Sequence, residues 1–215
     1  MSANSLDDLF DGYRVFRQKH YAVEAERYRD LAAVGQTPRS MIIACSDSRV
    51  DPSRIFDARP GELFVVRNVA NLVPPCEAQG SYHGTSAAIE FAVEMLQIER
   101  ILILGHARCG GVRAFLEGAA HGGPAESFIE KWISLLGPAY EALLAGDNPE
   151  DFEDRRLLLE QISVAHSIAN LMTFPFVQKA VAAGKLQLHG GFFAIATGQL
   201  QLLDQATGRF ATVAG

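Results

Sequence analysis

Short apolar runs alternate with helical patterns along most of the chain. Three runs, at residues 41–44, 63–67 and 101–105, are apolar on both faces of an extended segment, and each is followed by a helical stretch. Strands buried on both faces and separated by helices are typical of a parallel sheet flanked by helices. Two closing strands are predicted between residues 185 and 210, on either side of Gly198. The pattern therefore predicts an α/β fold.

Helical spacing of apolar residues also marks the N-terminal segment. The residues with this spacing are Leu6, Leu9, Phe10, Tyr13 and Phe16. A more polar helix is predicted over residues 23–33, before Gly35 ends it. We expect residues 1–35 to form a helical arm that docks on another surface. Further helices are predicted over residues 52–56, 85–96, 109–117, 126–144 and 155–172.

Length and charge narrow the classes of function. A chain of 215 residues suits a single domain over residues 1–215, with a core large enough to need no disulfides. The net charge of -6 and the lack of a basic cluster argue against a nucleic-acid partner. No apolar run reaches the ~18 residues of a membrane span, and the N-terminus lacks an export signal. We therefore expect a small-molecule partner and no membrane association.

The chain contains three cysteines, Cys45, Cys76 and Cys109, which cannot all be paired in disulfides. An unpaired set points to a reducing compartment, with the cytoplasm as the default, where thiols serve as ligands or nucleophiles. Cys76 follows two prolines and has no polar company, so we interpret it as incidental. Cys45 and Cys109 are the candidates for chemistry.

The first predicted strand ends in three reactive side chains. In Cys45-Ser-Asp47-Ser-Arg49 a thiol, a carboxylate and a guanidinium stand at alternate positions. Alternate residues of a strand share one face, so the three groups would converge while the chain stays extended. Burying them unpaired is costly, so they either satisfy one another or hold a ligand.

The third predicted strand ends in His106, and Cys109 follows three residues later at the start of a helix. The carboxyl ends of parallel strands border the crevice where ligands bind, so Cys45 could lie beside this pair. Two thiolates and one imidazole suit zinc, and three protein ligands with an open fourth position are the pattern of a catalytic site. Asp47 either completes the tetrahedron or pairs with Arg49 and leaves the fourth position to water. The sequence thus predicts one zinc ion per chain.

Three segments together resemble the β-class carbonic anhydrases, in the plant-like branch. They are Cys-Ser-Asp-Ser-Arg at 45–49, Gly-His-x-x-Cys-Gly-Gly at 105–111, and the intervening 61–75 segment that contains Arg-Asn-Val-Ala-Asn. The similarity extends over about residues 36–193, and the combination of motifs is highly specific.

The resemblance implies reversible hydration of CO2 to bicarbonate and a proton. It implies zinc held by Cys45, His106 and Cys109, and a zinc-bound hydroxide oriented by a dyad of Asp47 and Arg49. It also implies a parallel sheet of four strands with a further strand at its edge, and a homodimer that often assembles further.

The same resemblance implies a substrate pocket lined by Gln36, Phe64, Val69 and Phe91, some of them supplied across the dimer interface. Such a pocket suits CO2, which has no net dipole and needs a small apolar slot. The plant-like branch usually has tyrosine where this chain has Phe91, so the hydrogen bond of that hydroxyl is missing.

Some family members close their zinc site, with the aspartate moving from its arginine to the metal, and bicarbonate stabilises that form. The matching positions of the bicarbonate pocket here are Ile42, Arg67 and Phe193, of which only the arginine keeps the family residue. We therefore expect no bicarbonate regulation and an open site, with Asp47 as a zinc ligand only in a closed form.

Two other functions stay open at this level. A hydrolase of a CO2-like molecule, such as COS or CS2, would use the same zinc site and differ only in access to the pocket. A non-catalytic zinc-binding regulatory module would keep the ligands and lose Asp47 or Arg49, yet this chain has both.

Overall fold

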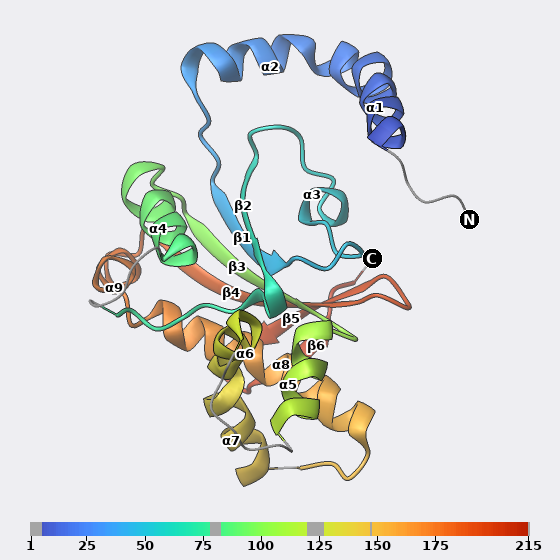
Figure 1. Ribbon diagram of the computed structural model, residues 1–215. Coiled ribbons are helices and arrows are strands. Elements are labelled where there is room, and N and C mark those ends of the chain that lie inside the picture. Colours follow the sequence, from blue (N-terminus) through green and yellow to red (C-terminus); the bar gives the residue numbers. More distant parts are fainter. Residues whose placement is uncertain (1–5, 78–82, 120–126, 147, 215) are drawn as a thin grey trace.

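A computed structural model describes residues 6–77, 83–119, 127–146 and 148–214 of the protein (Figure 1). In this part of the chain six strands form one sheet in the order β2-β1-β3-β4-β5-β6. The strands are β1 (Ser40–Cys45), β2 (Leu63–Asn68), β3 (Arg100–His106), β4 (Gln187–Ala194), β5 (Gln199–Asp204) and β6 (Arg209–Thr212). The first four in this order are parallel, and β5 and β6 run antiparallel at one edge.

The predicted α/β class and parallel sheet are confirmed. The two closing strands around Gly198 are β4 and β5, and β6 lies beyond the single edge strand that was expected. A tight turn makes this extra strand: the Asp204 carboxylate accepts the Ala206 backbone N–H, and Gly208 adopts a positive φ of 70°. That left-handed conformation is accessible to glycine at little cost, which explains the reversal.

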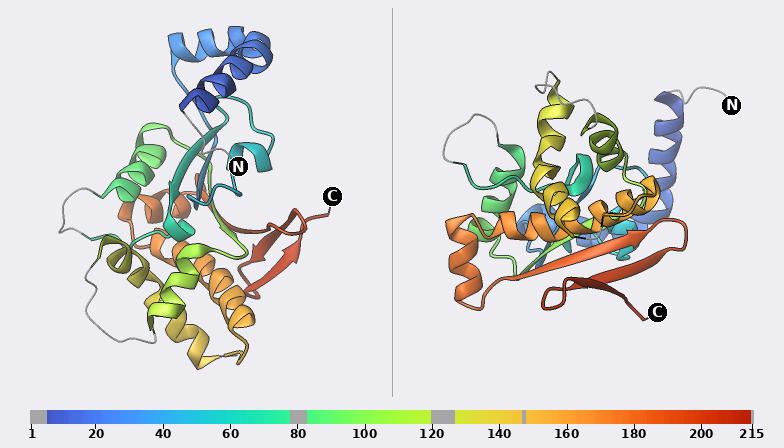
Figure 2. Two further views of the ribbon diagram at one scale, coloured as in Figure 1. Left: turned by 45° about the vertical axis from the view of Figure 1, so that its right-hand side comes forward. Right: turned by 90° about the horizontal axis from the view of Figure 1, so that it is seen from below.

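The N-terminal arm consists of α1 (Leu6–Val15), the π-helical segment η1 (Phe16–Tyr21) and α2 (Ala22–Val34). It stands clear of the helices that cover the sheet (Figure 2). The arm returns to the body through polar contacts: Arg27 donates to the Pro60 carbonyl, and Arg59 pairs with Glu24. No helix among the described residues is long and apolar enough to cross a membrane.

The remaining helices follow the strands. They are α3 (Pro52–Ile55), α4 (Gly84–Glu90) with the π-helical η3 (Phe91–Met95), α5 (Gly110–Ala119), α6 (Phe128–Ile133), α7 (Gly137–Ala145), α8 (Phe152–Leu171) and α9 (Pro175–Ala182). The helix predicted over residues 126–144 is wrong as one element, because a 3-10 turn, η4 (Ser134–Leu136), separates α6 from α7. Pro138, which cannot donate a backbone hydrogen bond, stands in the first turn of α7. Residue 126 lies outside the described residues.

The two faces of the sheet carry cores of different size. Met41 and Ile43 of β1 point into a large cluster with side chains of α4, α8 and α9, including Ile89, Val164 and Val177. The alternate residues of β1 point to the opposite face, where the buried cluster consists of Ile42, Ala44 and Leu104, with partly buried side chains around it. The second face therefore has a thin cover within one chain. The assignment of residues 1–215 to a single domain stays a prediction.

Candidate metal centre

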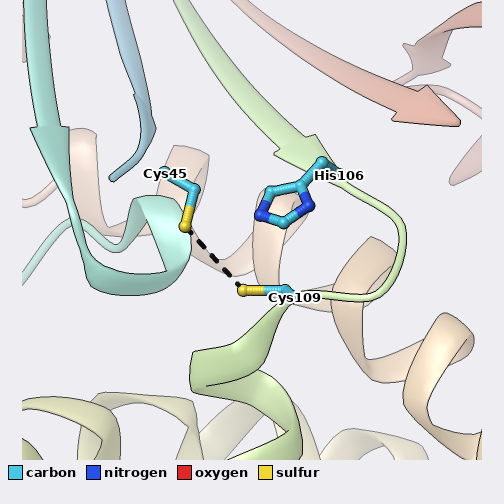
Figure 3. Close-up of side chains that lie close together, drawn as sticks. All are labelled: Cys45, His106 and Cys109. Carbon is cyan, nitrogen blue, oxygen red and sulfur yellow. Dashed lines mark hydrogen bonds between the residues drawn. The ribbon is translucent and has the colours of Figure 1, made fainter. Parts of the chain in front are cut away.

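Two neighbouring parallel strands bring Cys45 and His106 together. Ala44 of β1 pairs with Leu104 of β3, so both strands end at the same edge of the sheet. Cys109 returns to this edge from the β3–α5 turn (Figure 3). One ligand atom from each of the three side chains lies within 4.8 Å of the other two, and the two Sγ atoms are 3.9 Å apart. All three residues are buried.

The backbone around the two thiols favours their ionised form. The backbone of Asp47 lowers the pKa of Cys45, and the backbone of Gly111 and Val112 at the start of α5 acts in the same direction on Cys109. The hydrogen bond from Cys109 lowers the pKa of Cys45, and the same bond together with burial raises the pKa of Cys109. A bound dication would stabilise both groups as thiolates.

The His106 ring is oriented as a ligand. Its Nδ1 lies 2.9 Å from the Ala107 carbonyl oxygen. Since a carbonyl oxygen can only accept a hydrogen bond, Nδ1 is the donor. In the neutral ring the other nitrogen, Nε2, carries the lone pair, and it is buried without a hydrogen-bond partner in the described part of the structure. A buried imidazole nitrogen without a hydrogen-bond partner is unfavourable, and a metal ion would use its lone pair. The three residues fit a soft to borderline divalent ion, and zinc is the best match.

Asp47 and Arg49 follow Cys45 closely along the chain and pair with each other. Arg49 Nε and Nη2 donate to the two carboxylate oxygens at 2.9 and 2.6 Å, and the Arg49 backbone N–H adds a third bond at 3.0 Å. The Arg49 hydrogen bonds hold the pKa of the Asp47 carboxyl well below its usual range. Arg49 Nη2 also donates to the Arg108 carbonyl at 3.1 Å, which ties the dyad to the Cys109 turn. Among the described residues, the cluster of mutually close ligand atoms does not include Asp47.

The loop after Cys45 is fixed by Arg67. The Arg67 guanidinium donates to the carbonyls of Cys45 and Asp47 at 2.9 and 2.6 Å, and Asp51 lies 3.6 Å away. Ile42 is buried on β1, and Phe193 of β4 pairs with His106. Arg67 is thus occupied in holding the backbone beside the metal centre.

Only one of the four predicted pocket residues lies beside the metal centre in the same chain. Val69 follows β2 directly and contacts the Gly111 position. Phe64 pairs with Met41, four residues before Cys45, which places it about 13 Å back along the strand at ~3.3 Å per residue. Phe91 stacks on Phe64 with ring centroids 5.9 Å apart, and Gln36 is exposed before β1 begins. The structure does not bring these three to the Cys45 centre of their own chain.

Sequence reasoning missed Glu160, which lies on α8 behind the metal centre. Its carboxylate accepts the backbone N–H of Cys109 at 2.7 Å and that of Arg108 at 3.2 Å. Glu160 is buried, and burial raises its pKa to about 7. One feature of the sequence could have indicated this residue. Arg156 and Glu160 are a charged pair on the buried side of a long helix, where apolar side chains are expected.

A close approach of two turns explains Gly111. A Cβ at this position would lie 2.7 Å from Val69 Cγ1 and 3.0 Å from Ala70 Cβ, whereas a Cβ on Gly110 would meet nothing within 4 Å. We expect Gly111→Ala to lower the free energy of unfolding by ~1–3 kcal/mol through overpacking, and Gly110→Ala to leave it nearly unchanged. Denaturant unfolding of both variants checks this. Equal stability of the two would contradict the close contact.

Comparisons with known proteins agree with this geometry. The family model described as carbonic anhydrase matches residues 40–200. Beta carbonic anhydrase 5, chloroplastic, of Arabidopsis thaliana is 38% identical over 188 residues, which cover 87% of this chain and 61% of the plant protein's length.

Solved structures show the same fold. The β-carbonic anhydrase CcaA superposes with a TM-score of 0.89 at 28% identity, covering 98% of this chain and 92% of that one. A tetrameric β-carbonic anhydrase from Sordaria macrospora superposes with a TM-score of 0.72 at 30% identity. The match covers 97% of this chain and 95% of that one. The chain therefore belongs to the carbonic anhydrase family, in its β class.

Proposed function

We propose that the protein catalyses the zinc-dependent, reversible hydration of CO2 to bicarbonate and a proton. The observation that carries this proposal is the buried Cys45, His106 and Cys109 cluster beside the Asp47–Arg49 pair, in a chain of the carbonic anhydrase family. A zinc ion held by the three ligands would lower the pKa of a water molecule and so supply hydroxide as the nucleophile.

The dyad gives the nucleophile its direction. Asp47 stays ionised because Arg49 binds both of its oxygens, so it can only accept a hydrogen bond. A hydroxide that donates a hydrogen bond to Asp47 would keep its proton and present a lone pair to the carbon of CO2. Arg49 in turn is held by the Arg108 carbonyl, so the acceptor is preorganised before substrate arrives.

The substrate pocket would be completed by residues from a second copy of the chain. Val69 lies beside the metal centre, whereas Gln36, Phe64 and Phe91 lie far from it in the same chain. We propose that a partner subunit supplies the equivalent of these three residues, which places the active site at the interface of a homodimer. The Sordaria macrospora relatives are described as tetrameric, which supports a homo-oligomer.

The arm should be part of this interface. Leu9 and Phe10 of α1 are 70% and 48% exposed, an unfavourable state for large apolar side chains on one stripe. We expect the wild type to sediment as a dimer or larger, and the pair Leu9→Asp and Phe10→Asp to shift it to monomer with loss of hydration activity. Arg29→Ala on α2 should behave as wild type. A fully active monomer at assay concentration would contradict a shared pocket.

The pH profile should follow a single ionisation. Because Arg49 lowers the pKa of Asp47, that carboxylate is already ionised at neutral pH and contributes no further step as pH rises. Two thiolate ligands donate more charge to the metal than imidazoles do, so the water used as nucleophile should lose its proton only at higher pH. We expect kcat to rise with pH as one titration, without bicarbonate regulation. A steep multi-proton transition, or bicarbonate inhibition that vanishes at high pH, would contradict an always open site.

Hydrolysis of COS or CS2 is the second candidate function, because those molecules would use the same centre. Initial rates with CO2, COS and CS2 on one zinc-loaded preparation distinguish the candidates. We expect CO2 hydration to exceed both by a wide margin; a higher kcat/KM with COS or CS2 would reassign the enzyme, and no turnover of any of the three would indicate a non-catalytic zinc-binding module.

The cytoplasmic location expected from the cysteines stays a prediction, since the Arabidopsis thaliana relative is named chloroplastic.

A further inference from the structure

A buried carboxylate on α8 holds the backbone of the turn that carries Cys109. Glu160 Oε1 accepts the Cys109 N–H at 2.7 Å, and Oε2 accepts the Arg108 N–H at 3.2 Å. Each oxygen thus binds one of two consecutive amides. Arg108 between them adopts a positive φ of 59°, a conformation that is strained for a side chain other than glycine.

The surroundings of Glu160 hold its carboxyl group in this place. Glu160 is only 2% exposed, so an unpaired carboxylate there would be strongly unfavourable. Arg156, one turn earlier on α8 and also buried, lies 3.3 Å from Glu160 Oε1, and its other end contacts Glu153 at 2.5 Å. Glu153 also faces the Arg108 side chain at 3.5 Å. The carboxylate is therefore locked by its own helix and aimed at the metal-centre turn.

We infer that Glu160 is a positioning residue of the metal centre, which holds the Arg108–Cys109 peptide so that the Cys109 thiolate faces Cys45 and His106. The carboxylate binds the backbone of the turn and acts through the cysteine. The inference rests on the proposed function, because it assigns Glu160 a role only if the three residues bind zinc. The same peptide carries the Arg108 carbonyl that binds Arg49, so one residue of α8 would align both the ligand and the dyad.

The chain offers a matched pair of variants. In Glu160→Gln the side chain keeps its length but presents one acceptor oxygen instead of two, so one of the two amide bonds is lost. Glu153→Gln changes the same residue type on the same helix and touches the side chains of Arg156 and Arg108, but it makes no bond to the turn backbone. A difference between these variants therefore reports the backbone bonds.

Zinc release from the loaded protein to a chromogenic chelator, and the thiolate-to-cobalt charge-transfer band of the cobalt(II)-substituted protein, are the two readouts. We expect Glu160→Gln to release zinc about 10- to 100-fold faster than wild type and to shift the cobalt band, as for other residues that orient a metal ligand. Glu153→Gln should stay close to wild type in both. A purely structural role would lower the melting temperature of Glu160→Gln and leave the release rate and the band unchanged, which would overturn the inference.

Two further outcomes are informative. If Glu160→Gln does not fold, the wild-type zinc protein decides: the Cys109 amide proton should be shifted downfield and protected from exchange, and an unprotected amide would overturn the inference. If the wild type binds no zinc, the proposed function itself fails. Zinc binding by the wild type with unaltered release from Glu160→Gln refutes only the role of Glu160.

Discussion

Cys109→Ala is expected to lose zinc and CO2 hydration together. The Cys109 thiol is buried 3.9 Å from that of Cys45, and a site reduced to one thiolate and one imidazole keeps too few soft ligands to retain the ion. Elemental analysis of the purified protein should give about one zinc ion per chain in wild type and close to none in the variant. Hydration measured by stopped flow should fall to the uncatalysed rate.

The remaining cysteine provides the control. Cys76 is exposed, and its backbone N–H donates to the Thr173 hydroxyl. A substitution of the side chain keeps this bond. Cys76→Ala should therefore keep its zinc and its activity. Full zinc content in Cys109→Ala, or equal loss in Cys76→Ala, would refute the assignment of the ligands.

Asp47→Ala and Arg49→Ala should separate metal binding from catalysis. The Asp47 carboxylate is hydrogen-bonded to Arg49 and is not part of the cluster of close ligand atoms. Removing the Asp47 side chain therefore leaves the three ligands in place. We expect both variants to keep zinc and to lose about 10- to 1000-fold in kcat/KM, the range for one positioned catalytic group. Zinc analysis and stopped-flow hydration on the same samples measure the two effects.

An exposed ion pair on α5 is the matched control for the Asp47–Arg49 dyad. Arg113 and Glu117 on α5 form an exposed pair at 2.7 Å, which resembles the dyad in chemistry but faces solvent. Arg113→Ala should retain activity. Near wild-type turnover of Asp47→Ala would reduce the dyad to a structural ion pair, and zinc loss from Asp47→Ala would make Asp47 a ligand in the resting state.

The parts of the fold and site that sequence predicted are those with local signals. Cys45 and His106 each follow an apolar run, and parallel strands end at one edge, so the sequence indicated that the two residues could meet, and the pairing of β1 with β3 brings them together. Asp51 before Pro52 marked the start of α3, whose Arg54 N–H the Asp51 carboxylate caps. These features depend on a few neighbouring residues.

What sequence could not predict depends on contacts between distant segments. Glu160 lies 51 positions from Cys109, and no spacing rule connects a helix carboxylate to a turn amide. Gly111 is glycine because another turn, at Val69 and Ala70, packs against it. The strand β6 has only four residues, too few for an alternating pattern to emerge, and it forms because Gly208 permits the preceding turn.

Zinc titration of the metal-depleted protein tests the central claim most directly. Zinc is removed with a chelator and returned in steps, and CO2 hydration is measured at each step by stopped flow together with bound zinc. We predict that activity is absent without zinc, rises in proportion to the bound ion, and saturates at about one zinc per chain. Full hydration activity in the metal-free protein, or a fully zinc-loaded protein with no activity, would contradict the proposed function.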